Sequence, residues 1–146
     1  MISISAISGQ GPFSQAMETA ASGMRAQATR MRLVSENLAN ANSTASVPGG
    51  LPYQRKTMSF EQAIDSATGA VIVQPGPVGR DPSPFRSVYD PSSPAANPQG
   101  YVAMPNVSEV VEMGDMRESE RSYEANLAVL GQARSMIAKT LDILKA

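Results

Sequence analysis

The chain has 146 residues, a net charge of -1, and neither cysteine nor histidine. The near-neutral charge offers no basic field for nucleic acid, and the missing thiols and imidazoles exclude disulfides, thiolate metal sites and a usual general base. Hydrophobic residues make up 42% of the chain but aromatic residues only 5%. This composition favours long helices packed on one another over a thick globular core.

The first predicted element is a helix from Phe13 to Asn42. Its apolar residues recur with heptad spacing, which predicts a seam along one side of the helix. One series is Met17, Met24, Met31 and Leu38; the other is Phe13, Ala20, Val34 and Ala41, interrupted at Gln27. Pro48-Gly49-Gly50 ends the pattern.

Three short runs with strand composition come next: Tyr53–Phe60, Ala70–Gln74 and Phe85–Tyr89. Together they predict a small hairpin-like module, marginal without support. The segment from Tyr89 to Glu109 then contains four prolines. We expect it to be an extended return arm without ladder hydrogen bonds, the alternative being a disordered linker.

The last predicted element is a helix from Val107 to the end, opened by a capping box of Asn106 and Glu109. It repeats the heptad pattern. One series is Met116, Tyr123, Leu130, Ile137 and Leu144; the other is Met113, Leu127 and Leu141, interrupted at Glu120 and Arg134.

These elements predict a mainly α fold. Two long terminal helices would pair as an antiparallel coiled coil, with a small β-hairpin-like insertion and an extended proline-rich return arm. The expected parts are the N-terminal helix over 1–42, the insertion and arm over 43–105, and the C-terminal helix over 106–146.

Acidic residues gather where the last helix begins, and six of them lie between 106 and 124 beside two arginines. A carboxylate metal site is disfavoured because the helical Glu-and-His motif has no histidine here. Helix-dipole and i,i+3 pairing explain the cluster more simply. A further interpretation is orientation: Arg25, Arg30 and Arg32 would face this acidic stretch in an antiparallel pair, for example through Arg32 and Glu112.

No catalytic motif is present, so neither an enzyme nor a cofactor is expected. No apolar run is long enough to span a membrane, and MISISAISGQG lacks the basic start of a secretory signal. Val129, Met136 and Ile143 form a second apolar row beside the main seam of the last helix. A second row needs another surface to cover it, so we expect the chain to pack against other chains.

Three stretches together resemble bacterial flagellar basal-body rod proteins, of the rod and hook axial protein family. They are SGMRAQATRMRLVSENLANANST, YDPSSPAANPQGYVAMPNVSEVVEMGDM and SYEANLAVLGQARSMIAKTLDIL. The sequence departs from the family pattern at Gly114, where a larger residue is usual, and at Ser93, where a histidine is common.

The resemblance implies a structural subunit of the proximal rod. Such subunits stack with themselves and other rod subunits into a helical tube that crosses the periplasm, transmits torque and passes export substrates. They leave through the flagellar type III export apparatus without a cleaved signal. Assembly positions implied by the motifs and seams are Met17, Met24, Met31, Asn37, Leu38, Asn40, Asn42, Tyr123, Glu124, Asn126, Leu127, Leu130, Ile137 and Leu141. The competing hypothesis is a helical adaptor or export chaperone of a type III secretion system.

Overall fold

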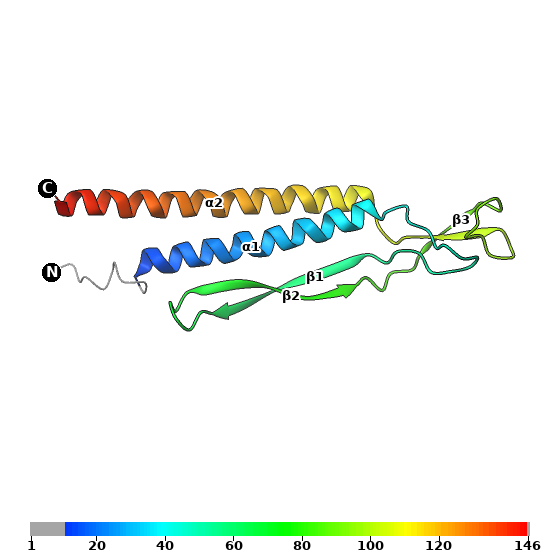
Figure 1. Ribbon diagram of the computed structural model, residues 1–146, viewed down its shortest axis with the longest axis horizontal. Helices are drawn as coiled ribbons and strands as arrows, with labels where there is room; N and C mark the ends of the chain where they lie inside the picture. Colours follow the sequence, from blue (N-terminus) through cyan, green and yellow to red (C-terminus); the bar gives the residue numbers. More distant parts are fainter. Residues whose placement is uncertain (1–10, 146) are drawn as a thin grey trace. The chain divides into compact units, whose positions relative to one another are not determined.

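The computed structural model describes residues 11–145. Its elements, in chain order, are α1 (Pro12–Ala39), β1 (Lys56–Ile64), β2 (Val71–Arg80), β3 (Arg86–Tyr89), β4 (Tyr101–Met104) and α2 (Glu109–Lys145) (Figure 1). The N-terminal stretch predicted to lack a secretory signal lies outside the described residues as far as residue 10.

The prediction of a mainly α fold was wrong. The helices contain 28 and 37 residues, but strands of 9, 10, 4 and 4 residues accompany them. The strands form two separate two-stranded sheets, β1 with β2 and β3 with β4. The fold is therefore mixed, because the middle of the chain forms more strand than its short apolar runs indicate.

The prediction of a coiled coil between the terminal helices holds only in part. Ala20 and Ala26 of α1 are buried, whereas Met17, Met24 and Met31 are half-buried. On α2 the fully buried positions are Glu112 and Ser119, while Leu127 and Leu141 of one heptad series are exposed. Small and polar side chains fill the positions that a coiled coil gives to large apolar ones.

The proline-rich strip is not a return arm free of ladder hydrogen bonds. Its residues Tyr101–Met104 form β4, which pairs antiparallel with β3 in the register Tyr89↔Tyr101 to Arg86↔Met104. The Tyr89 and Tyr101 rings meet edge to face, 5.2 Å between centroids. Gly100 permits the turn, because its φ is 84° and a Cβ there would lie 2.8 Å from the Tyr89 ring.

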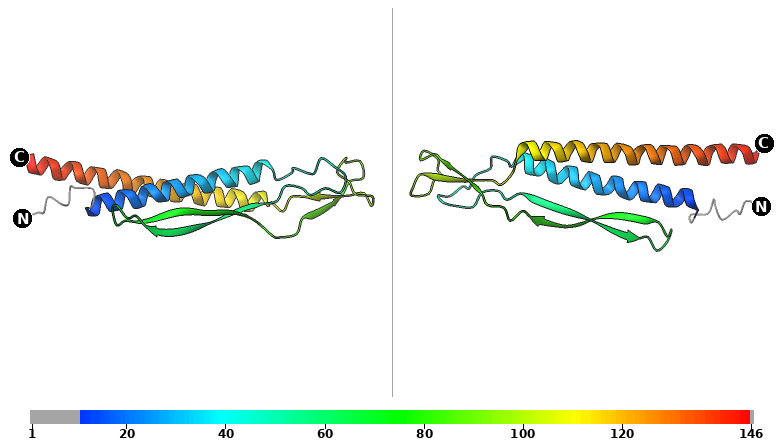
Figure 2. Two further views of the ribbon diagram at one scale, coloured as in Figure 1. Left: turned by 60° about the horizontal axis from the view of Figure 1, so that its bottom comes forward. Right: turned by 180° about the vertical axis from the view of Figure 1, so that it is seen from behind.

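The chain divides into two compact units, each built from parts distant in sequence. Within the described residues, unit 1 contains 11–30, 60–76 and 118–145, and unit 2 contains Met31–Ser59 and Pro77–Arg117. In each unit a part of α1 runs beside a part of α2 in the opposite direction, as the views in Figures 1 and 2 agree. Each unit is described here by itself.

In unit 1, polar side chains of α1 bind the backbone of the β1–β2 hairpin. Gln15 donates from Nε2 to the Thr68 carbonyl at 2.9 Å, and Thr19 donates from Oγ1 to the Val71 carbonyl at 2.8 Å. The Val73 N–H donates to Ser22 Oγ at 3.1 Å. These bonds give hydrogen-bond partners to backbone groups at the turn and at the edge of the hairpin.

The two helices of unit 1 meet through small residues. A Cβ added to Gly23 would lie 2.8 Å from Asn126 Nδ2, so the Asn126 side chain of α2 packs directly against Gly23 of α1. Ser119 is fully buried, and Ala133 nearly so. Arg30 pairs with Glu118 at 3.6 Å, and its guanidinium lies 5.9 Å from the centre of the Phe60 ring.

Candidate functional site

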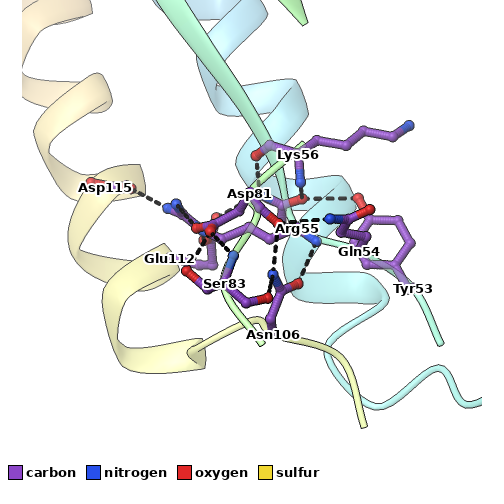
Figure 3. Close-up of polar contacts among 10 residues, drawn as sticks. Tyr53, Gln54, Arg55, Lys56, Asp81, Ser83, Asn106, Glu112 and Asp115 are labelled. Atoms are coloured by element: carbon purple, nitrogen blue, oxygen red, sulfur yellow. Dashed lines mark hydrogen bonds and ion pairs between the residues drawn. The ribbon is translucent and has the colours of Figure 1, made fainter. Parts of the chain in front are cut away.

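Arg55 is the centre of a polar cluster in unit 2 (Figure 3). We call this cluster the Arg55 latch; its other members are Asn37, Asp81, Asn106, Glu112 and Asp115. Arg55 lies one residue before β1, and its guanidinium binds three carboxylates from other parts of the chain. Nε donates to Glu112 Oε1 at 2.5 Å, Nη2 to Asp115 Oδ2 at 3.2 Å, and Nη1 to Asp81 Oδ2 at 3.4 Å. Asp81 directly follows β2 and the other two acids lie on α2, so one side chain joins three segments.

Glu112 is the most deeply buried acid of the latch, with an exposed fraction of 0%. Its Oε1 accepts from Arg55, and its Oε2 accepts from Asn37 Nδ2 at 3.1 Å. A buried carboxylate is tolerated only when it is paired and hydrogen-bonded. Both oxygens have partners here, so Glu112 fixes the start of α2 against α1 and the approach to β1 within unit 2.

Asn37, near the end of α1, acts as a substitute strand partner. Its Nδ2 donates to the Lys56 carbonyl at 2.9 Å, and its Oδ1 accepts from the Lys56 N–H at 2.9 Å. The same Oδ1 also accepts from the Tyr53 hydroxyl at 2.9 Å. A side-chain amide presents the donor and acceptor of a peptide group, so Asn37 pairs with the first residue of β1 as a neighbouring strand would.

Asn106 supplies a second amide of this kind, from the segment before α2. Its Oδ1 accepts the Arg55 N–H at 2.8 Å, and its Nδ2 donates to the carbonyls of Asp81 and Ser83 at 3.0 Å each. Gln54 Nε2 also donates to the Asp81 carbonyl, at 2.8 Å. Asn106 was predicted to cap the last helix. Its side chain instead binds the backbone of Arg55, Asp81 and Ser83, which lie next to the ends of β1 and β2.

The pKa values of Arg55 and Asp81 in the latch are both shifted toward the charged form. Burial alone would lower the pKa of Arg55, but the hydrogen bond and charge of Glu112, with Asp81 and Asp115, raise it above the ordinary arginine value. Hydrogen bonds from the Ser83 side chain and backbone, and then Arg55, hold the pKa of Asp81 below its usual range. Burial, followed by the charges of Glu36 and Glu112, raises the pKa of Tyr53.

These contacts give the latch a structural role. The carboxylates of Glu112, Asp115 and Asp81 all accept hydrogen bonds from the Arg55 guanidinium. Among residues 11–145, no group of three or more histidine, cysteine, aspartate or glutamate side chains is arranged to hold a metal ion. The same part of the chain has no helix long and apolar enough to cross a bilayer.

The predicted match between Arg32 and Glu112 was wrong. Both carboxylate oxygens of Glu112 accept from Arg55 and Asn37. Arg25 pairs within its own helix, with Glu18 at 2.7 Å, and Arg30 alone of the three arginines pairs with α2, at Glu118. The sequence argument missed Arg55 because it considered only charges on the two helices.

The motif asparagines predicted as assembly positions make bonds within the chain. Asn37 is 1% exposed and belongs to the latch. Asn40 Nδ2 donates to the Glu36 carbonyl at 2.8 Å, and Asn42 Nδ2 donates to Glu109 Oε1 at 3.2 Å from an exposed position. In unit 1, Asn126 Nδ2 donates to the Ser122 carbonyl at 2.9 Å.

The remaining predicted assembly positions differ in exposure. Half-buried are Met17, Met24, Met31, Tyr123, Leu130 and Ile137; exposed are Leu38, Glu124, Leu127 and Leu141. In unit 1, α2 exposes further large apolar side chains, and we call the whole set the α2 apolar surface. Its members are Leu127, Val129, Met136, Leu141, Ile143 and Leu144. Exposed large apolar side chains are typical of interaction sites, whereas the buried α2 positions of this unit, Ser119 and Ala133, are small.

Unit 2 also contains an open groove of about 540 Å³ beside the start of α2. Asn42, Arg86, Asn106, Glu109 and Val110 contribute to its lining. Both polar and apolar residues line it, so the groove has the mixed character of a protein contact surface.

Comparisons with known proteins match both ends of the chain. The model of the flagella basal body rod protein family matches residues 17–45, and that of the flagellar basal body rod FlgEFG protein C-terminal family matches residues 99–143. The two matches cover most of α1 and most of α2, so both terminal helices are similar to those of rod-type proteins of the flagellar basal body.

Full-length relatives narrow this class. The flagellar basal-body rod protein FlgC of Agrobacterium fabrum is 49% identical over 92% of this chain and 97% of its own length. The FlgC proteins of Escherichia coli O6:H1 and Bacillus subtilis are 41% and 38% identical, over 86% and 88% of this chain and 93% and 96% of their own lengths. The chain belongs to the flagellar basal-body rod protein FlgC family. This membership favours the rod protein over the adaptor or export chaperone.

Proposed function

We propose that this rod protein assembles with copies of itself and with other rod subunits into the wall of a helical tube. The tube transmits torque along its length and leaves a central path for export substrates. The α2 apolar surface is the main contact with neighbouring subunits, and the protein acts by packing and not by catalysis.

The observation that carries the proposal is the orientation of side chains on α2 in unit 1. Ser119 and Ala133 are buried, while Leu127, Val129 and Ile143 are 50%, 50% and 77% exposed. Burying one such side chain contributes roughly 1.5–3 kcal/mol. The isolated subunit lacks this free energy of burial, and it gains it when neighbouring subunits cover the helix.

The same proposal includes where the protein acts and how it arrives. We place it in the basal-body rod that crosses the periplasm, delivered by the flagellar type III export apparatus without a cleaved signal peptide. Membership of the FlgC family supports the location. An intact N-terminus in protein recovered from basal bodies, read by mass spectrometry, tests the route.

Replacing the apolar surface tests the assembly role. In a strain lacking the corresponding gene, we expect the wild-type chain to restore swimming and to be found in purified basal bodies. Leu127→Ser together with Val129→Ser is expected to abolish both while leaving the folded helical content unchanged, because neither side chain is buried in the chain itself.

Ala125→Ser with Ala128→Ser provides a matched control on the same turns of α2, since both positions are exposed but not large and apolar. This variant should swim. Normal incorporation of the double serine variant into basal bodies would show that another surface makes the contact.

A further inference from the structure

The exposed side of α1 in unit 1 is shallow and charged. Ala21 and Ala28 are small, and Arg25 lies between them one helical turn from each. The Arg25 guanidinium binds Glu18 Oε1 at 2.7 Å, yet its side chain remains 65% exposed. Along α1 this face therefore presents a negative and then a positive charge.

The exposed side of α2 in unit 1 presents the opposite charges when it is read against the chain direction. Arg134 comes first, then Gly131, then Leu127, and then Glu124, all of them exposed. No heavy atom lies within 4 Å of the place where a Cβ on Gly131 would stand. The fold of one chain thus has no need of a glycine there, although glycine disfavours a helix.

We propose that α1 of one copy packs antiparallel on α2 of a second copy, with Ala21 opposite Gly131. This register places Glu18 opposite Arg134. It also places the Arg25 stem on Leu127, with the guanidinium in reach of Glu124. The inference rests on the proposed function, because it names the neighbour that covers part of the α2 apolar surface.

Charge and shape both favour a second copy of this chain as the partner that packs on the exposed face of α2. The order of charges on α1 complements the order on α2 only when the helices are antiparallel, and such complementarity fixes register. Gly131 and Ala21 allow two helices to approach closely, as small residues do at helix contacts. Arginine stems commonly cover apolar surface while the charge stays in water.

The proposed contact uses different faces on the two copies, so it does not close on itself. Every copy keeps a free α1 face and a free α2 face, which generates a ring or an open helix. Within one chain Gly23 lies against Asn126, which sets Ala21 level with Ala128. Pairing with Gly131 instead displaces the second copy by roughly three residues, about 4.5 Å along the helix axis.

Disulfide trapping in purified basal bodies tests the contact directly, because the chain contains no cysteine. A chain carrying both Ala21→Cys and Gly131→Cys is expected to give a ladder of covalent oligomers on oxidation. A mixture of the two single variants should give dimers and nothing larger. The matched control, Ala21→Cys with Lys139→Cys, moves one thiol about two turns along α2 and should give no ladder.

Three outcomes overturn the inference while the proposed function stands. They are dimers formed by either single variant alone, a bond to a different rod protein in place of the ladder, and no bond in any sample whose basal bodies contain the protein. Absence of even the wild-type chain from basal bodies refutes the proposed function itself.

A charge exchange tests the register without cysteines. Arg25→Glu should lower the amount of protein in basal bodies at least tenfold, and adding Glu124→Arg in the same chain should restore it to within twofold. Pairing Arg25→Glu with Lys139→Glu is the control and should not restore it. Equal amounts for the single and the rescued variants would overturn the pairing.

Discussion

The two units hold α1 to α2 by different chemistry. Unit 2 uses the Arg55 latch, in which a fully buried carboxylate and two side-chain amides join segments distant in sequence. Unit 1 uses close packing at Gly23 and Ser119, and several of its large apolar side chains on α2 are exposed. The latch therefore fixes distant segments to one another within unit 2, whereas unit 1 leaves apolar area exposed, which is the area that our proposal assigns to contacts with neighbouring subunits.

The largest expected effect comes from opening the latch. Arg55→Ala leaves Glu112 buried without its cation, and breaking a buried pair in this way costs about 3 kcal/mol or more. Urea unfolding followed by circular dichroism measures the change. Arg117→Ala, an exposed arginine on α2 in the same unit, should change the free energy of unfolding by less than about 0.5 kcal/mol. Similar values for both variants would deny the latch its role.

Removing the substitute strand partner should have the next largest effect. Asn37→Ala leaves the Lys56 N–H and the Tyr53 hydroxyl without their acceptor and Glu112 without one donor, so we expect a loss of about 2 kcal/mol. Asn42→Ala, which removes one exposed bond, is the control and should lose under about 0.5 kcal/mol. A thermal midpoint that moves equally in both variants contradicts the assignment.

Two glycine substitutions in unit 1 should act in opposite directions. Gly131→Ala is expected to raise the free energy of unfolding by up to about 1 kcal/mol, because alanine favours a helix and meets no atom there. Gly23→Ala is expected to lower it by about 1 kcal/mol, because the new Cβ displaces Asn126. Stabilisation by both changes, measured by urea titration, would show that the helices are not in close contact at Gly23.

The smallest effect concerns acid. Because the pKa of Asp81 is lowered in the folded chain, its contribution to stability is complete above the unfolded-state value of about 3.9 and is lost as the pH falls through the folded value. Asp81→Asn should therefore flatten part of the decline in stability between pH 5 and pH 2. Asp65→Asn makes the same comparison in unit 1, where Thr68 and Ala67 donate to the carboxylate and lower its pKa. If the free energy of unfolding of both variants depended on pH as it does in the wild-type chain, the lowered pKa values of Asp81 and Asp65 would be contradicted.

Local pattern identified the helices well and the contacts between elements poorly. Heptad spacing gave α1 and α2 almost to their ends, because helix periodicity is a property of neighbouring residues. It also assigned Leu127 and Leu141 to an intrachain seam, whereas both are exposed. Periodicity identifies an apolar face but does not say which molecule will cover it.

Local sequence periodicity could not reveal the Arg55 latch. Arg55 and Glu112 are 57 residues apart, and an arginine beside a predicted strand carries no signal of its partner. Four prolines likewise concealed β4, because Tyr101–Met104 lies after Pro98 and before Pro105, in a short stretch free of proline. The aromatic Tyr101 and the β-branched Val102, residue types enriched in strands, are the signal that was available there.

The separation between Asn37 and Glu112, 75 residues, has a consequence for synthesis on the ribosome. A chain that emerges from its N-terminus exposes Asn37 and Arg55 long before their carboxylate partner arrives, and closing so large a loop carries an entropic penalty. Unit 2 therefore completes only when translation has passed α2. Truncated products that end before Glu112 cannot close it, which leaves them open to proteases while finished subunits are protected.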